Sequence, residues 1–98
     1  PFPDMSVFAA AGEKFLASVP IARQCVVLTW VPDSIPSPWD NKDTAERIAS
    51  DLGTRSIITQ LEGLSTFDKV HLNSASAERW SAAFLDQLEP ILRECGAY

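Results

Sequence analysis

The chain has 98 residues, of which 46% are hydrophobic, and its formal net charge at pH 7 is −5. This length allows one small domain, and the hydrophobic share is ordinary for a globular protein, which argues against a disordered chain. The eight Lys and Arg residues are scattered rather than clustered, which argues against nucleic acid and anionic membrane surfaces as partners, and no apolar run approaches the roughly 20 residues of a membrane span.

The first predicted element is a helix over residues 4–19. Asp4 or Ser6 is its candidate N-cap, and Pro20 ends it. Apolar residues recur at helical spacing along it and predict its buried face, which comprises Val7, Phe8, Ala11, Phe15 and Val19.

A strand is predicted over residues 25–31, which are almost entirely apolar. A strand that is apolar on both faces is typical of a parallel sheet covered by helices on each side. Pro32 ends the strand and opens an irregular loop that reaches residue 40. Ligands bind at the carboxyl ends of strands in open α/β sheets, so residues there are candidates for lining an acyl or sugar pocket. These candidates are Trp30, Pro32 and Trp39, and the alternative is that the two tryptophans fill the core.

The second half of the chain repeats the order of a helix followed by a strand, and then ends in a further helix. A helix is predicted over residues 41–52, with Asp40 or Asn41 as its cap and Gly53 at its end, followed by a strand over residues 56–61. The predicted buried stripe of this helix comprises Ala45, Ile48, Ala49 and Leu52. The last helix is expected to begin near residue 74 with Asn73 as its N-cap, and Pro90 is expected to kink it or split off its final turn. Its predicted buried stripe comprises Ala77, Trp80, Phe84, Leu88, Ile91, Leu92 and Cys95.

The order helix–strand–helix–strand–helix predicts an α/β fold with right-handed crossovers, parallel strands and helices outside. Two strands make a poor sheet by themselves. Covering both faces of residues 26–31 needs more strands and helices than the 98 residues supply. We therefore expect a further partner, which is either another segment of the same protein or another copy. The sequence opens on Pro1 rather than on a methionine, so we also expect a piece of a longer protein that does not report its own targeting.

The two cysteines are far apart in sequence but should meet in space. In an α/β layer each helix runs antiparallel to the strands, so the end of the last helix lies near the start of the first strand. Cys25 and Cys95 then lie at the same end of the sheet, where either a disulfide or two buried free thiols fit. A disulfide would favour an exported protein. One histidine and two distant cysteines make a poor zinc site, and neither a metal nor a cofactor is expected.

The stretch Asp68-Lys69-Val70-His71-Leu72-Asn73 holds the single histidine, with a carboxylate three residues before it. A histidine oriented by a nearby carboxylate is a ready general base, because its ordinary pKa lies near neutrality. The pair falls in the loop that precedes the last helix. None of the loop serines stands in a strand-to-helix nucleophile turn, so the residues indicate a base without its nucleophile.

Asp68-x-x-His71-Leu72-Asn73 and the amphipathic helix after it resemble the C-terminal end of the SGNH hydrolases, also called the GDSL family. The strand and proline over residues 26–32 are similar to the penultimate region of that family. The resemblance implies a flavodoxin-like three-layer α/β/α domain, of which residues 1–98 would be the C-terminal portion. One departure is Ser76, which stands where the family often has a glycine.

The resemblance also implies a chemistry, namely ester hydrolysis or O-acyl transfer by a Ser-His-Asp mechanism. The acyl group would be acetyl or another acyl group on a carbohydrate, in an exported or periplasmic setting. His71 would be the general base, Asp68 would orient it, and Asn73 would cap the last helix. The Gly-Asp-Ser block is absent, so the serine would come from the N-terminal portion of the same domain, and these residues alone would be inactive. The alternative function is a non-catalytic α/β module that binds a protein or a glycan.

Overall fold

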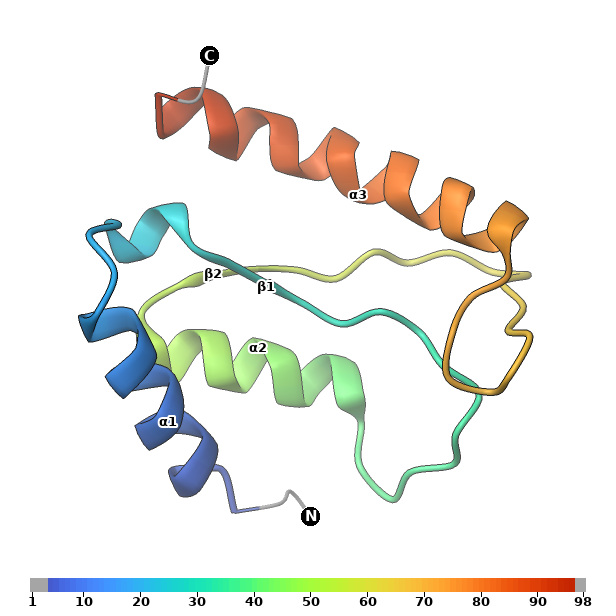
Figure 1. Cartoon of the computed structure of the whole chain (residues 1–98), viewed down its shortest axis with the longest axis horizontal. Helices are drawn as coiled ribbons and strands as arrows, with labels where there is room; N and C mark the ends of the chain where they lie inside the picture. The colour runs from blue at the N-terminus through green and yellow to red at the C-terminus, as the bar shows by residue number, and fades with distance from the viewer. Residues whose placement is uncertain (1–3, 97–98) are drawn as a thin grey trace.

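The computed structural model describes residues 4–96, and within this range the chain is a small mixed α/β fold (Figure 1). Three α-helices, one short 3₁₀ helix and two parallel strands follow one another in the predicted order. They are α1 (Ser6–Ala17), η1 (Arg23–Cys25), β1 (Val27–Thr29), α2 (Asn41–Leu52), β2 (Arg55–Ile57) and α3 (Ser74–Glu94). None of these helices is both long and apolar enough to cross a membrane.

The two strands pair in parallel, with Leu28 opposite Ser56 in the centre of the ladder. Both strands are shorter than predicted. At its start β1 is cut short because Cys25 belongs to η1. At its end the Thr29 hydroxyl donates a hydrogen bond of 2.6 Å to the carbonyl oxygen of Ile57. In a parallel ladder the backbone N–H of the residue after Thr29 would bond to the Ile57 carbonyl oxygen. The Thr29 hydroxyl therefore competes with the next backbone hydrogen bond of the ladder.

The helices lie on both sides of the sheet, with α2 on one side and α3 on the other (Figure 1). The predicted buried stripes of both helices are confirmed, because every residue of each stripe is buried or half-buried. The predicted caps of α2 are also present, whereas the N-cap of α1 is Met5, which makes no side-chain capping bond, and not Asp4 or Ser6. Asp40 accepts a hydrogen bond from the backbone of Asp43 at the start of α2, and Gly53 ends that helix in the left-handed region at φ 69°. The most buried apolar side chains are Leu16, Ala49, Leu52, Ile57 and Trp80.

The predicted buried face of α1 is wrong. Val7, Phe8 and Phe15 are 71%, 59% and 65% exposed, and the helix packs against α2 through a different side. A Cβ atom on Gly12 would lie 2.8 Å from Leu52 Cδ1, so the absent side chain lets the two helices approach closely. Helical spacing alone could not choose between the two faces, because both carry residues that can be buried.

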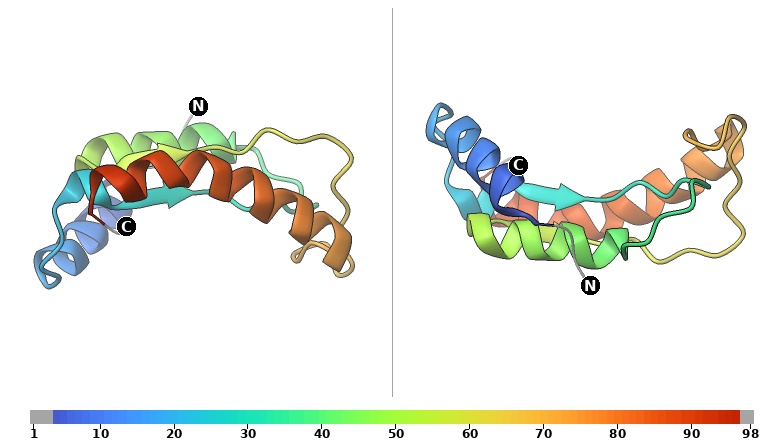
Figure 2. Two further views of the ribbon diagram at one scale, coloured as in Figure 1. Left: turned by 90° about the horizontal axis from the view of Figure 1, so that it is seen from above. Right: turned by 90° about the horizontal axis from the view of Figure 1, so that it is seen from below.

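Of the two effects predicted for Pro90, the split is absent, because α3 continues through Pro90 to Glu94 as one helix. An ion pair between Glu89 and Arg93, with 2.7 Å between the charged atoms, spans this part of the helix. The helix follows the curve of the whole molecule (Figure 2). The Cys25–Cys95 disulfide also holds the C-terminal end of α3.

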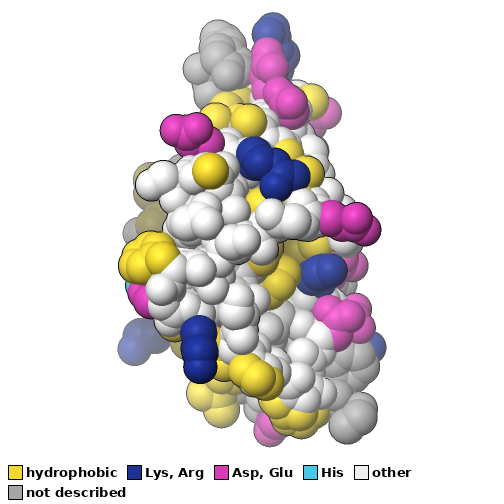
Figure 3. Space-filling model, turned by 90° about the vertical axis from the view of Figure 1, so that its right-hand side faces the viewer, with side chains coloured by type: hydrophobic (Ala, Val, Ile, Leu, Met, Phe, Trp, Pro, Cys, Tyr) yellow, Lys and Arg dark blue, Asp and Glu magenta, His cyan; other side chains and the backbone are white. Residues whose placement is uncertain are grey.

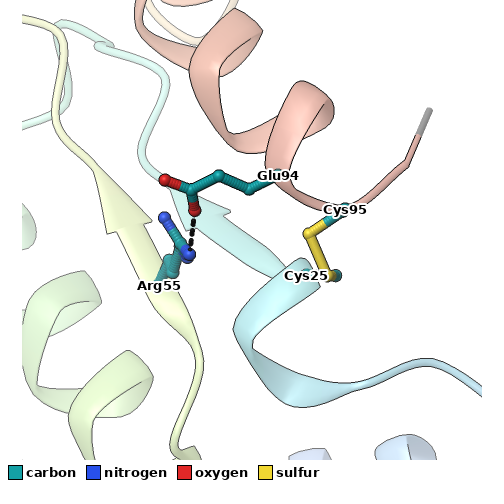
Figure 4. Close-up of a disulfide and its surroundings, with 4 residues drawn as sticks. All are labelled: Cys25, Arg55, Glu94 and Cys95. Atoms are coloured by element: carbon teal, nitrogen blue, oxygen red, sulfur yellow. Dashed lines mark hydrogen bonds and ion pairs between the residues drawn. A yellow bond between two sulfur atoms is a disulfide. The ribbon is translucent and has the colours of Figure 1, made fainter. Parts of the chain in front are cut away.

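Cys25 and Cys95 form a disulfide, so of the two arrangements that fit the sequence the structure has the bonded one. The two Cα atoms are 5.8 Å apart, which is an ordinary separation for bonded cysteines. Beside this bond Arg55 of β2 forms an ion pair with Glu94 of α3 (Figure 4). Both contacts join the end of α3 to the end of the sheet where β1 begins.

Candidate active site

The Asp68–His71 pair lies on a loop between β2 and α3, at the end of the sheet where both strands finish (Figure 1). The loop is closed at its base by an antiparallel bridge between Thr66 and Leu72. Within it the Phe67 backbone N–H donates to the carbonyl oxygen of His71 at 3.1 Å. A further hydrogen bond of 2.7 Å runs from the backbone N–H of Ser34 to the carbonyl oxygen of Lys69, which ties the loop to the segment after β1.

Asp68 and His71 are joined by both side-chain and backbone contacts. Asp68 Oδ2 lies 2.6 Å from His71 Nδ1, and Asp68 Oδ1 accepts hydrogen bonds from the backbone N–H groups of Val70 and His71 at 3.0 and 2.6 Å. The turn requires Lys69 in the left-handed region, at φ 72°. This conformation is uncommon for a residue other than glycine, and here it allows the carboxylate to face the histidine that follows it.

These hydrogen bonds determine which nitrogen of the imidazole ring carries the proton and which carries the lone pair. The bond to the His71 ring is the largest influence on the Asp68 carboxyl, and with the backbone N–H groups it lowers the pKa of Asp68 to about 2. At neutral pH the carboxylate has no proton to give, so Nδ1 of a neutral ring must be the donor. The lone pair is then on Nε2, which has no hydrogen-bond partner among residues 4–96. The His71 side chain is 68% exposed, so an incoming group can reach it.

Hydrogen bonds at the start of α3 hold the loop in place. Asn73 caps the helix as predicted, because its side-chain oxygen accepts from the backbone N–H of Ser76 at 2.9 Å. Ser76 is only 5% exposed, and its hydroxyl oxygen accepts from the backbone N–H of Ser65 at 2.8 Å. Ser76 therefore joins the start of α3 to the loop. The sequence carries no local signal for this role, because Ser65 lies 11 residues earlier.

A mostly apolar cavity of about 420 Å³ adjoins the histidine. It lies between the segment after β1, the loop and the first turns of α3. Phe67 stacks on the His71 ring nearby, with 5.9 Å between the ring centres. The indole N–H of Trp80 is buried and has no hydrogen-bond acceptor among the described residues. The cavity is lined by Val31, Val70, His71, Leu72, Ala77, Trp80 and Ser81.

The three residues predicted to line a substrate pocket do not share this cavity. Trp30 and Pro32 line a separate cavity of about 250 Å³ that also contains Lys42 and Gln60. Trp39 lines a third cavity, of about 310 Å³, between α1 and α2. All three are half-buried. Their role in substrate binding stays a prediction, and the structure does not bring them together around His71.

The site has a base but no nucleophile of the expected kind. Ser81 borders the cavity, but it lies within α3 rather than in a turn between a strand and a helix. Within residues 4–96 no three His, Cys, Asp or Glu side chains are grouped as a metal site would need. At this end of the molecule hydrophobic side chains are mixed with acidic and basic ones, and no patch of a single charge forms (Figure 3). The arrangement can take up a proton at Nε2 and return it.

Comparison with known proteins finds no family model, no curated protein and no solved structure that matches this chain.

Proposed function

We propose that this chain supplies the general base and its orienting carboxylate to an acyl-transfer site of the SGNH type. The observation that carries the proposal is the 2.6 Å contact between Asp68 Oδ2 and His71 Nδ1, on a histidine whose side chain is 68% exposed. A serine hydroxyl is too weak a nucleophile at neutral pH, and a base in this arrangement is what activates it. The serine belongs to a polypeptide segment outside the described residues.

The proposed reaction runs in two steps. Nε2 of His71 takes the proton of the serine hydroxyl while the serine oxygen attacks the ester carbonyl, and Asp68 stabilises the positive charge that builds on the ring. The protonated ring then gives its proton to the departing alcohol, which leaves an acyl ester on the serine. In the second step His71 removes a proton from the acceptor, and the serine leaves with that proton. Water as the acceptor gives an esterase, and a carbohydrate hydroxyl gives an O-acyltransferase.

The fold supports the proposal without deciding it. Helices on both sides of a parallel sheet are what the C-terminal half of a three-layer α/β/α domain would have. The Cys25–Cys95 bond is compatible with an exported or periplasmic location, where such bonds persist. In this proposal Trp30 and Pro32 line a neighbouring part of the substrate site, with an acetyl or other acyl ester of a carbohydrate as the substrate class.

The test is the hydrolysis of p-nitrophenyl acetate by the protein isolated from the cells that make it. His71→Ala is expected to lower turnover by about 10³-fold or more, and Asp68→Asn by somewhat less, since the ring would lose its orientation but keep its lone pair. Asp51→Asn is the matched control, because Asp51 is an exposed carboxylate on α2, and it should leave turnover unchanged. Wild-type turnover in His71→Ala would refute the proposal and favour the non-catalytic binding module.

A further inference from the structure

The two outer edges of the sheet differ in their chemistry. Residues 26–31, which include β1, contain no charged residue and no proline, whereas β2 begins with Arg55 and has Ser56 exposed. Natural proteins protect a true edge strand with charged or polar side chains, because an open apolar edge pairs with other chains. β2 therefore has the composition of a terminal strand, and β1 has the composition of an interior strand.

The backbone of β1 has hydrogen-bonding groups on its open side. Arg55 N–H donates to the carbonyl oxygen of Val26 at 3.0 Å, and backbone direction alternates along a strand. Val26 and Leu28 therefore bond to β2, while the N–H and C=O groups of Val27 and Thr29 point to the other edge. The side chains of β1 are only half-buried, although the strand is apolar and central in the fold.

The surface of the molecule is larger than that of a self-contained monomer. A folded chain of 10.7 kDa should expose about 5,500 Å², and this chain exposes 6,561 Å². Its radius of gyration is 14.7 Å, against about 13 Å for a compact domain of this length. The excess of about 1,000 Å² is comparable to the roughly 800 Å² that each partner contributes to a standard interface.

The shape of the molecule restricts what can cover this edge. The chain is curved, and β1 lies along its concave side, between α1 at one end and the loop before α3 at the other (Figure 2). Ile21, which precedes η1, and Val31, which follows β1, are 54% and 48% exposed. A second copy of this chain would have the same concave side around its own β1. The projecting ends of the two copies, α1 and the loop before α3, would then meet before the two β1 strands came within the spacing of about 4.8 Å that pairing needs.

We infer that the open edge of β1 is a docking surface for an apolar strand of a different polypeptide segment. That strand runs parallel to β1, because a strand that is apolar on both faces is typical of a parallel sheet covered by helices. It accepts hydrogen bonds from, and donates them to, the backbone groups of Val27 and Thr29. The identification of this segment with the part that carries the serine rests on the proposed function, whereas the surface itself does not.

The test compares amide hydrogen exchange at Thr29 in two samples: the protein isolated from the cells that make it, and the 98-residue chain produced alone. Thr29 is expected to exchange at least about 100-fold more slowly in the isolated protein, because its N–H is then bonded to the added strand. Val27→Pro should abolish this protection, since proline removes a donor on the open edge while leaving the pairing with β2 intact. Ser56→Pro is the matched control, because it removes a donor on the outer edge of β2, and protection at Thr29 should persist.

Three results would each overturn the inference. They are equal Thr29 exchange in the two samples, undiminished protection in Val27→Pro, and a native mass spectrum in which the isolated protein consists of copies of this chain only. Circular dichroism of both proline variants as free chains checks that β1 and β2 still pair. His71→Ala separates this inference from the proposed function, because it should remove ester turnover and leave Thr29 protection unchanged.

Discussion

Replacing both members of the Cys25–Cys95 bond with serine should remove a large part of the stability of this chain. The bond joins residues that are 70 positions apart, and closing a loop of that length in the unfolded chain corresponds to about 4 kcal/mol in the chain-entropy model. A domain of this size is typically stable by 5–15 kcal/mol in total, as an order of magnitude. The double variant is therefore expected to be marginally folded at 25 °C.

The remaining contacts of α3 cannot replace the bond. Arg55 and Glu94 are both more than one third exposed, so their ion pair contributes less than about 1 kcal/mol. A hydrogen bond of 3.1 Å between the Gln87 amide and the Thr59 hydroxyl adds about 1 kcal/mol. Trp80, which is 8% exposed, is the most buried apolar side chain of α3, and it lies near the other end of the helix.

Urea unfolding followed by far-ultraviolet circular dichroism measures this loss. With a slope of about 1.5 kcal/mol per molar urea, the midpoint should fall by nearly 3 M. The wild-type chain with its disulfide chemically reduced is the control, because it should unfold at the same urea concentration as the double serine variant. A loss of less than about 1 kcal/mol in both would refute the reasoning, since it would mean that the bond does not restrict the unfolded chain.

Three further predictions concern the loop and the helices. The Asp68 carboxyl should titrate near pH 2 in a ¹³C NMR experiment, rather than near its ordinary pKa of 3.8. Its stabilisation of the loop is therefore present above about pH 4 and is lost as the pH falls through 2. A titration midpoint near pH 4 would contradict this prediction. Gly12→Val should cost about 2 kcal/mol of unfolding free energy, because the new side chain meets Leu52, whereas Ala11→Val on the exposed side should cost far less. Asn73→Ala should lower the unfolding free energy by about 1 kcal/mol and Asn73→Asp should not, by the same measurement; equal losses would contradict a capping role.

Several features of the fold could be predicted because they depend on neighbouring residues. A cap acts within three residues, so Asp40, Gly53 and Asn73 were identifiable from sequence. The stripes of α2 and α3 were identifiable because helical spacing repeats within the element itself. The contact between Asp68 and His71 is of the same local kind, since a turn of four residues brings the two side chains together.

Other features depended on residues that are distant in sequence. The buried face of α1 was predicted wrongly because Gly12 carries no side chain, and its importance comes only from Leu52, 40 positions later. The contact of Ser76 with Ser65 and the separate cavities of Trp30 and Trp39 depend on how the loops pack, which spacing does not encode.

The sequence by itself determined the order of the elements, the parallel α/β class and the single histidine with its carboxylate, because these follow from periodicity, caps and composition. Only the tertiary structure decided that the cysteines are bonded, that β1 lies open along a concave side, and that His71 borders a cavity lined by Val31 and Trp80. These depend on distances between segments far apart in the chain, and such distances are determined by packing of the whole molecule rather than by any local pattern.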